Sequence, residues 1–493
     1  MTRSAFFPNE IKDVIIIGAG PCGAGFTKSL LQDRSKYRSI RVFERRSVAG
    51  GLWNYDDVDE PLTLGPSTHA INPKNSNTGK YLWPTAAHKD LDTNIPYELM
   101  QYNTFKWTEK RRLFPTRSEV LKYFQTYSEA IEDYVEYNTS VVSVKQLDDL
   151  KWEVVVRPVS TETEGSLKQS FESGFEDRVF IADAVVIATG HYDIPRIPDF
   201  KGLKSWHQKY PGSIIHSKSF KSPEDYSAKD KILIIGNSAS AVDIIVHLKS
   251  KWNTEIDIYN SIRSKNNDSS ITIPGLTAVS EISQFNASEQ SVEFKDGKRI
   301  TGINKIIFAT GFLRTFPFLE DINSSNKPLL KSGNRIHGLW RHILSYEYPG
   351  LAVAGVPKYG GPMALAEVQG AWLSRVFLGE IDLPSINLMN KWEKDREGKL
   401  GHDAPNFHFL LHPEDVSYYN MLVREVKESS NPSAEGIEYL SQYYSTVRAN
   451  FKLIKKKYYD MISATGSMVY ELEELQSKAP FKLSTFTPGP LDV

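Results

Sequence analysis

Short apolar runs alternate with amphipathic stretches along most of the chain, and small or polar residues follow each apolar run. The first run, residues 14–17, leads into a glycine-rich turn and a helix-like stretch, and residues 231–250 repeat this order. A buried strand, a tight turn and a helix in succession are typical of a βαβ unit with a parallel sheet. The pattern therefore predicts an α/β protein with two such units.

Two later apolar strands end in the same three residues, DAVVIATG at 183–190 and KIIFATG at 305–311. The order is first turn, first ATG strand, second turn, second ATG strand, and then about 180 residues too rich in aromatic side chains for disorder. We interpret the second unit as an insertion into the first. Proline-bearing stretches ending at Pro198 and Pro328 indicate the borders.

The predicted architecture is thus two Rossmann-like dinucleotide-binding domains, one inserted into the other. Residues 1–197 form the first part of the outer domain, residues 198–327 the inserted domain, and residues 328–493 the rest of the outer domain with a helical carboxyl-terminal extension. The amphipathic stretch 435–462 predicts helices that pack back on the outer domain. Within it, Lys455, Lys456 and Lys457 are interpreted as a solvated helix face, and the polar segment 160–178 as an exposed hairpin loop.

The first turn carries Gly18, Gly20 and Gly23 at GxGxxG spacing. Glycine at these places permits a tight turn, close approach of the backbone to a pyrophosphate, and packing of helix on strand. The next predicted strand ends near Glu44, 21 residues after Gly23, the distance at which an acid binds a ribose hydroxyl pair. The combined pattern predicts a dinucleotide site; a turn that serves packing alone is the alternative.

The second turn is a less regular copy, with Gly236 at the first place, Ser238 at the second and Ala241 at the third. The strand after it has no terminal acid and offers Ser261 and Arg263, where a 2′-phosphate would lie. This favours NADPH over NADH. In the alternative interpretation, Arg263 is a surface cation.

Composition narrows the function classes. Lys and Arg total 59 against 60 for Asp and Glu, so no basic surface indicates a nucleic-acid partner. A single cysteine, Cys22, excludes an intrachain disulfide and a cysteine-rich metal site, and it favours a reducing, cytoplasmic location; no metal is expected. No apolar run is long enough for a transmembrane segment. Peripheral membrane attachment and a homodimer stay open.

The segment YPGSIIHSKSFK, residues 210–221, resembles the FxGxxxHxxx(Y/F)K fingerprint of the flavin-containing monooxygenases, with Tyr210 in place of the first Phe. Baeyer-Villiger monooxygenases have Trp-Pro where this chain has Phe220 and Lys221. Residues 50–55, 91–102, 308–319 and 367–385 are also similar to the family, so the resemblance covers about three quarters of the chain. The form of residues 91–100 and the serine-rich second turn look most like the fungal branch.

The resemblance implies FAD at the first turn and NADPH at the second. In that family, flavin reduced by hydride reacts with molecular oxygen to a C4a-hydroperoxide, and a small soft nucleophile takes one oxygen atom on sulfur or nitrogen. Thiols, thioethers and amines are such nucleophiles. The residues expected at the two cofactors are Gly18, Ala19, Gly20, Pro21, Cys22, Gly23, Glu44, Arg45, Gly51, Leu52, Trp53, Thr93, Asn94, Gly236, Ser238, Ala239, Ser240, Ala241, Val242, Asp243, Ser261, Arg263 and Gln369.

Asn94 is the expected catalytic residue, because the resemblance places it at the flavin edge and its amide can donate a hydrogen bond there. Its alternative is to cap a turn before Pro96. His216 is expected to be a packing or linker residue, and Cys22 a small packing residue with no part in electron transfer. Two other functions stay open: Baeyer-Villiger oxygenation of ketones, and a non-catalytic redox sensor that binds both nucleotides.

Overall fold

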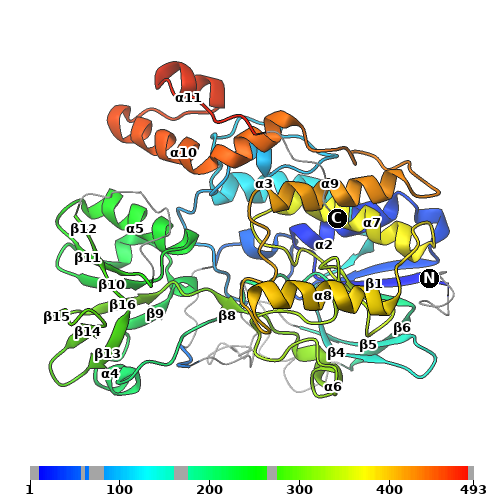
Figure 1. Cartoon of the computed structure of the whole chain (residues 1–493), viewed down its shortest axis with the longest axis horizontal. Helices are drawn as coiled ribbons and strands as arrows, with labels where there is room; N and C mark the ends of the chain where they lie inside the picture. The colour runs from blue at the N-terminus through cyan, green and yellow to red at the C-terminus, as the bar shows by residue number, and fades with distance from the viewer. Residues whose placement is uncertain (1–9, 57–61, 66–82, 160–175, 264–274, 487–493) are drawn as a thin grey trace, which may run out of the picture.

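The structure is a computed structural model that describes residues 10–56, 62–65, 83–159, 176–263 and 275–486. Two largely parallel sheets organise it into two lobes that lie side by side in Figure 1. The first lobe contains a seven-stranded sheet made from residues 13–187 and 339–353. The second lobe contains a five-stranded sheet from residues 214–308, so it is inserted between the two parts of the first.

The first sheet has the strand order β18-β19-β20-β7-β1-β2-β3. Its central strand β1 pairs in parallel with β2 and β7, and only the β18-β19-β20 edge contains antiparallel pairs. Strands β1 and β7 are apolar on both faces because packed layers cover both sides of the sheet. The bounds are β1 Asp13–Ile17, β2 Ser39–Phe43, β3 Val135–Glu136, β7 Ala184–Ile187, β18 Leu339–Trp340, β19 Leu344–Ser345 and β20 Leu351–Val353.

The second sheet is parallel throughout, in the order β12-β11-β10-β16-β9. Its bounds are β9 Ile214–His216, β10 Lys231–Ile235, β11 Asp257–Ser261, β12 Leu276–Val279 and β16 Lys305–Phe308. Smaller antiparallel sheets complete the lobes. They are β4 Thr139–Gln146, β5 Trp152–Pro158 and β6 Arg178–Ala182; β13 Ile282–Asn286, β14 Ser291–Phe294 and β15 Arg299–Thr301; and β8 Ile194–Pro195 with β17 Phe312–Leu313.

Helices cover the sheets. In the first lobe α2 and α7 cross where Gly370 of α7 meets Phe26 and Ser29 of α2: a Cβ on Gly370 would lie 2.9 Å from the Phe26 Cα. The absence of that carbon allows the two helices to approach closely. The bounds are α2 Pro21–Leu31, α3 Arg117–Ser128, α4 Leu203–Lys209, α5 Ala239–Trp252, α6 Glu320–Asn323, α7 Pro362–Phe377, α8 Ile386–Leu400, α9 Glu414–Lys427, α10 Gln442–Thr465 and α11 Leu472–Lys478.

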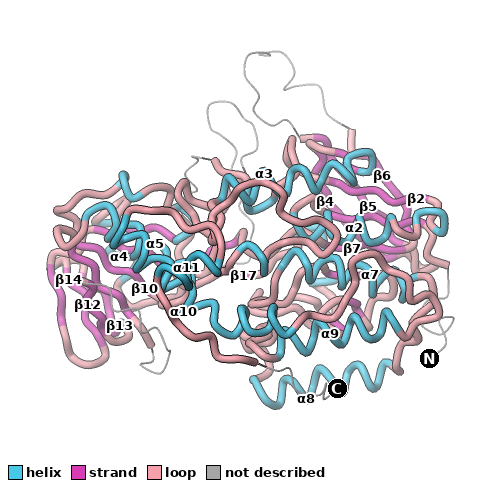
Figure 2. Tube along the Cα trace, turned by 90° about the horizontal axis from the view of Figure 1, so that it is seen from above, coloured by secondary structure: helices cyan, strands magenta, loops and turns pink. Residues whose placement is uncertain are grey.

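The carboxyl-terminal helices α10 and α11 lie over the junction of the lobes, above α5 in Figure 1 and between β10 and α9 in Figure 2. The apolar face of α10 carries Val447, Ile454 and Tyr458, and it packs against Tyr97 and Phe114 of the first lobe. The predicted fold class is therefore confirmed, including the inserted unit and the helical extension. Within the described ranges, no helix combines the length and apolar character that a membrane span requires.

Two sequence predictions concern segments around the sheets. Strands β5 and β6 pair antiparallel, as the two arms of the predicted hairpin require, but most of its loop, residues 160–175, lies outside the described residues. The domain borders at 197/198 and 327/328 stay predictions.

Candidate active site

The two glycine turns are built in the same way. The N–H of Gly18 donates to the Phe43 carbonyl at the end of β2, and the N–H of Gly236 donates to the Ser261 carbonyl at the end of β11. The ATG strands close both turns. A Cβ on Gly18 would lie 2.8 Å from the Ala188 carbonyl oxygen, and a Cβ on Gly236 would lie 2.4 Å from that of Ala309.

Gly23, the third glycine of the first turn, sets the approach of α2 to β1. A Cβ on Gly23 would lie 1.9 Å from the Gly18 carbonyl oxygen, so any side chain would push the helix away. Gly20 differs: its backbone has an ordinary φ of −75°, and its Cβ would meet nothing closer than the Gly51 Cα at 3.5 Å. The protein itself does not require glycine at position 20. The open space beside Gly20 therefore fits a ligand that approaches the backbone.

The amino terminus of α2 suits an anion at this place. Gly20 is the N-cap, Pro21 begins the helix, no side chain caps it, and its first turn contains no acidic residue. The first-turn N–H groups can therefore face a pyrophosphate. The residues present fit FAD at this turn.

Glu44 lies beside the first turn, at the carboxyl end of β2, and is buried. One carboxylate oxygen accepts from the Ala19 N–H at 2.8 Å and the other from the Arg46 N–H at 2.9 Å. These bonds hold the carboxylate in place, and each oxygen keeps a further lone pair for a ribose hydroxyl. The neighbouring Arg45 pairs with Asp193 in the connection between the lobes.

A short 3₁₀ turn, Gly51–Trp53, connects the glycine turn to the loop that carries Asn94. Gly51 lies against Gly20, and a Cβ on Gly51 would be 3.1 Å from the Gly20 Cα. The Trp53 carbonyl accepts from Arg117 at the start of α3. The Arg117 N–H in turn donates to the Leu91 carbonyl. Gly51 thus lies against the first turn, and cofactor contacts of Leu52 and Trp53, which follow it in the same 3₁₀ turn, stay predictions.

Thr93 and Asn94 follow directly in this loop. Thr93 is buried, and its hydroxyl donates to the Ile95 carbonyl at 2.8 Å. Asn94 is exposed, and within the described part of the chain its amide makes no hydrogen bond. The 3₁₀ turn Tyr97–Leu99 has Pro96 at its N-cap and no side-chain capping bond. The contacts therefore do not support Asn94 as a turn cap, and they leave its amide free for a ligand.

Lys455 on α10 is a residue that sequence analysis misinterpreted. Its ammonium donates to the Thr93 carbonyl at 2.5 Å, and burial lowers its pKa to about 8. The prediction of a solvated face is wrong for Lys455, because α10 turns the side next to Ile454 and Tyr458 toward the first lobe. Lys456 is exposed and pairs with Asp460, as a solvated residue would. The helical extension therefore supports the loop next to Asn94.

Gln369 and Cys22 both contact Gly355 in the first lobe. Gln369 is fully buried; its amide oxygen accepts from the Gly355 N–H and its amide nitrogen donates to Tyr418. Gly355 packs against Cys22, because a Cβ on Gly355 would lie 2.3 Å from the Cys22 Sγ. Burial raises the pKa of Cys22 to about 11, so its thiol is neutral at physiological pH. Both residues support the first turn by packing, and direct cofactor contacts for them stay predictions.

At the second turn the amino terminus of α5 is open. Ser238, Ala239 and Ser240 are exposed, the Ser238 hydroxyl makes no capping bond, and the first turn of α5 contains no acidic residue. Ala241 and Asp243 are buried and Val242 is half-buried. The hydroxyls of the two serines are therefore free to bind phosphate. The exposed residues of this turn fit a second dinucleotide, whereas direct cofactor contacts for Ala241, Val242 and Asp243 stay predictions.

Two residues that sequence reasoning missed stand beside this turn. The Asn260 amide donates to the Gly236 carbonyl at 2.7 Å and to the Ile234 carbonyl at 3.1 Å, which holds the turn to β11. Its signal was an asparagine next to Ser261 at the end of a short strand. Arg196 lies close enough to Arg263 that burial, and then the Arg263 charge, lower the pKa of Arg196.

The two residues predicted to bind the 2′-phosphate, Ser261 and Arg263, differ in their exposure and contacts. Arg263 is exposed, whereas Ser261 is buried and its hydroxyl donates to the Ser280 carbonyl at 2.9 Å. Because that hydroxyl has only one hydrogen, it has none left for a phosphate in this arrangement. Arg263, with Arg196 beside it, is the stronger candidate.

The fingerprint segment packs between the lobes. His216 on β9 is buried and donates from Nε2 to the Gly311 carbonyl at 2.9 Å, while burial lowers its pKa to about 3. Phe220 stacks edge-on against His88, and the Lys221 carbonyl accepts from the Lys89 N–H. These contacts support a packing role for His216. The fingerprint thus connects the second lobe to residues 85–89.

Comparison with known proteins agrees with this architecture. A family model described as flavin-binding monooxygenase-like matches residues 75–266 and 260–427. Flavin-containing monooxygenase FMO GS-OX3 of Arabidopsis thaliana is 31% identical over 401 residues, which cover 77% of this chain and 78% of that protein. Flavin-containing monooxygenase iboF of Amanita muscaria is 28% identical over 472 residues, covering 83% and 86% of the two chains.

Solved structures share the fold. The S-allyl-L-cysteine S-oxygenase of Allium sativum matches with a TM-score of 0.72 and 23% identity over 94% of this chain and 97% of that one. An open cyclohexanone monooxygenase matches with a TM-score of 0.52 and 14% identity over 84% and 98% of the two chains. At these identities the likeness is one of fold.

The chain belongs to the flavin-containing monooxygenase family. The family and the flavoprotein oxidoreductase class predicted from the fingerprint are confirmed. FAD and NADPH, the expected cofactors, are those of this family.

The contrast between Gly20 and Gly23 gives a test of the first turn. We expect Gly20→Ala to fold with the stability of the FAD-free parent but to bind FAD more weakly, since the new methyl group enters the ligand space. Gly23→Ala is expected to lose stability, by about 1 to 3 kcal/mol or more, because it overpacks helix against strand. Chemical denaturation of the FAD-free proteins and FAD titration measure the two effects. Equal loss of stability in both variants would contradict the assignment of the space beside Gly20 to a bound ligand.

Proposed function

We propose that the protein is an NADPH- and oxygen-dependent monooxygenase that oxygenates sulfur or nitrogen in small thiols, thioethers or amines. The observation that carries the proposal is the pair of open glycine turns, each at the carboxyl ends of parallel strands, in a chain of the flavin-containing monooxygenase family. FAD is assigned to the first turn and NADPH to the second. Ligands of α/β proteins bind at such edges.

The chain's own residues would hold FAD by positioning it. The open amino terminus of α2 would face the pyrophosphate, Gly20 would allow close approach, and Glu44 would accept hydrogen bonds from the ribose hydroxyls. When bound and reduced, the flavin reacts with molecular oxygen and supplies one oxygen atom to a nucleophile. The protein need not supply a nucleophile or an acid-base pair of its own. The high pKa of Cys22 agrees with an electron path that contains no protein thiol.

Asn94 is proposed as the catalytic residue. Its exposed amide has no protein partner among the described residues, and its loop is held by Arg117 on one side and Lys455 on the other. A preorganised hydrogen-bond donor stabilises charge that develops at the reacting atoms without reorganisation. Asn94 would orient the flavin edge and the nicotinamide and help to exclude water.

Arg263 is proposed to select NADPH. It lies two residues after the end of β11, is exposed, and has Arg196 as a cationic neighbour. Two guanidinium groups close together repel each other, and a phosphate dianion between them would relieve that repulsion. Arg196 is thus a second candidate for the 2′-phosphate.

Two observations bear on the substrate class. Phe220 and Lys221 occupy the places where Baeyer-Villiger enzymes have Trp-Pro, and the fold is more similar to the S-oxygenase than to the cyclohexanone monooxygenase. Both favour soft nucleophiles over ketones. Membership in a family of enzymes favours catalysis over a redox sensor. The cytoplasmic location and a homodimer stay predictions.

The function is tested by incubating the purified enzyme with NADPH, air and a mixture of thiols, thioethers, amines and ketones. Mass spectrometry is expected to find sulfur or nitrogen compounds that have gained one oxygen atom, together with NADPH-dependent oxygen uptake. Esters or lactones formed from the ketones would replace the proposal by its Baeyer-Villiger alternative. Bound nucleotides without oxygen uptake would support the sensor.

Asn94→Ala is expected to bind FAD normally but to lose oxygenation. Removing one preorganised donor costs about 2.7 to 4 kcal/mol at such sites, so product per NADPH should fall and hydrogen peroxide should rise. Asn406→Ala, which removes an exposed asparagine elsewhere, serves as the matched control. A parental ratio of product to NADPH in Asn94→Ala would exclude the proposed role.

Arg263→Ala should narrow the preference for NADPH over NADH by about ten- to a hundredfold, because a charge-assisted bond to phosphate contributes about 1.5 to 3 kcal/mol. The measurement is the ratio of kcat/KM for NADPH to kcat/KM for NADH. Arg299→Ala removes another exposed arginine of the same lobe and should leave that ratio unchanged. If Arg263→Ala behaves like Arg299→Ala, Arg263 does not bind the phosphate.

A further inference from the structure

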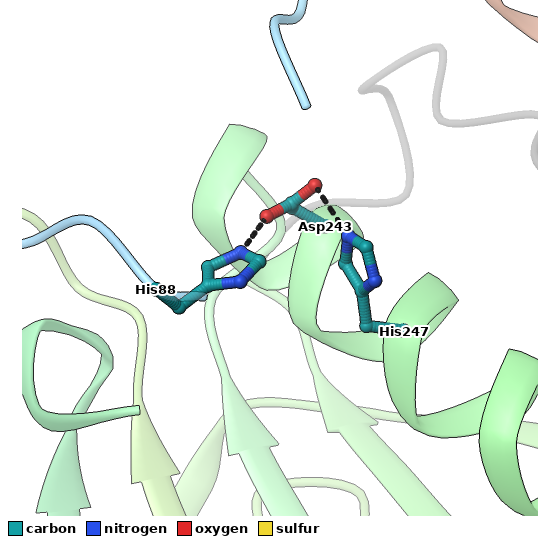
Figure 3. Close-up of side chains that lie close together, drawn as sticks. All are labelled: His88, Asp243 and His247. Carbon is teal, nitrogen blue, oxygen red and sulfur yellow. Dashed lines mark hydrogen bonds and ion pairs between the residues drawn. The ribbon is translucent and has the colours of Figure 1, made fainter. Parts of the chain in front are cut away.

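Two histidines and an aspartate meet where α5 of the second lobe faces residues 83–92 of the first. Asp243 and His247 are four residues apart on α5, so they lie on one face of the helix. His88 reaches the same carboxylate from the first lobe, 155 positions earlier in the chain. Figure 3 shows the Asp243 carboxylate between the two imidazole rings. All three side chains are largely buried, with exposures of 5%, 6% and 15% for His88, Asp243 and His247.

The spacing of the three groups suits a metal ion. The His88 Nε2 lies 2.5 Å from one Asp243 oxygen, the His247 Nε2 lies 3.6 Å from the other, and one ligand atom from each residue falls within 4.8 Å of the rest. Nitrogen and oxygen ligands lie about 2.0 to 2.2 Å from Zn²⁺ in tetrahedral sites, which puts neighbouring ligand atoms roughly 3.4 Å apart. Small side-chain rotations would bring all three to that distance.

One of these ring nitrogens lies within ion-pair distance of Asp243 but makes no hydrogen bond. The His247 Nε2 is buried, faces the carboxylate, and makes no hydrogen bond at 3.6 Å. A buried ring nitrogen without a hydrogen bond costs free energy unless a further group binds it. A cation between His247, Asp243 and His88 would satisfy it.

The local charge is compatible with a bound cation. Besides Asp243, the carboxylates of Asp92 and the exposed Asp90 act on His247. Two cations oppose these carboxylates: the Lys455 ammonium acts on Asp92 and Asp243, and the Arg112 guanidinium lies 3.8 Å from Asp92. When both imidazoles are neutral, the carboxylates therefore exceed these cations by one charge, which favours a cation at the Asp243 carboxylate.

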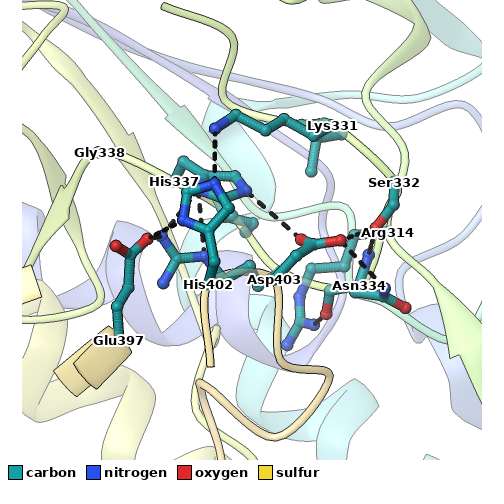
Figure 4. Close-up of polar contacts among 12 residues, drawn as sticks. Arg314, Lys331, Ser332, Asn334, His337, Gly338, Glu397, His402 and Asp403 are labelled. Atoms are coloured by element: carbon teal, nitrogen blue, oxygen red, sulfur yellow. Dashed lines mark hydrogen bonds and ion pairs between the residues drawn. The ribbon is translucent and has the colours of Figure 1, made fainter. Parts of the chain in front are cut away.

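Among the described residues, a second group of metal-type ligands already contains a cation. His337, Glu393 and Glu397 surround Arg335, whose fully buried guanidinium pairs with both glutamates at 2.5 Å, and Figure 4 shows the adjoining contacts of His337, Glu397 and Asp403. The arginine already supplies the positive charge there. This group therefore serves as the internal control.

We propose that His88, Asp243 and His247 bind one divalent transition-metal ion, best matched by Zn²⁺, and that the ion ties α5 to the first lobe. Two imidazoles and one carboxylate suit zinc, with water as the fourth ligand. The expectation of no metal rests on the lack of cysteine ligands, which this site does not use. The site does not depend on the proposed oxygenation, because it lies on the buried side of α5, behind its exposed first turn.

The test uses the full-length flavoprotein after treatment with a chelator. Equilibrium dialysis against Zn²⁺, with bound metal measured by mass spectrometry, should give one ion per chain, and binding should weaken as the pH falls because protons compete for the imidazoles. His88→Asn and His247→Asn should each weaken binding by at least the roughly ten- to hundredfold that loss of an outer-shell partner costs. His337→Asn should bind like the parent. No bound zinc, or parental binding in the His88 and His247 variants, would overturn the proposal.

A second measurement covers the case in which a variant does not fold. Crystals of the parent protein soaked in Zn²⁺ should show an anomalous peak at the zinc edge between the three side chains. Mg²⁺ at the same concentration should not displace it, since Mg²⁺ prefers octahedral oxygen ligands. A peak only at exposed histidines such as His402, with none at His88, would refute the site.

Discussion

The site depends on glycines that allow a helix to pack closely against the end of a strand. At the first turn, Gly18 and Gly23 leave no room for side chains, because the Ala188 carbonyl and the Gly18 carbonyl occupy that space. At the second turn the Ala309 carbonyl closes on Gly236 in the same way. The ATG strands therefore pack against the two turns. Each turn leads into a helix whose amino terminus lies at the end of the strand. The fold therefore has two helix amino termini, those of α2 and α5, that can bind anions.

Contacts between distant segments hold these two ends relative to each other. The fingerprint segment places Phe220 against His88 and joins Lys221 to Lys89, while α10 places Lys455 on the Thr93 carbonyl. The loop that carries Asn94 is thus supported by the first lobe and by the carboxyl-terminal extension together. The extension therefore has a physical role in the site, because it stiffens a loop whose Asn94 side chain is exposed.

The sequence predicted the features whose chemistry is local. Strand, glycine turn, helix and Glu44 follow one another within a short stretch, and spacing alone reveals their geometry. The role of Lys455 could not be predicted in the same way, because its partner Thr93 lies 362 positions away. His88 and Asp243 likewise meet only through the fold. Gln369 is expected near the cofactor on resemblance; it is buried and its amide oxygen accepts from the Gly355 N–H, and its contact with the cofactor stays a prediction.

The proposed function requires transfer of one oxygen atom from molecular oxygen to the substrate, and isotope labelling follows that atom. The enzyme is supplied with NADPH, ¹⁸O₂ and the thioether or amine that it oxidises best, in unlabelled water. We expect one ¹⁸O atom in each product molecule and about one oxygen molecule consumed per NADPH. Product that carries only unlabelled oxygen, or NADPH oxidation that yields hydrogen peroxide alone, would contradict it.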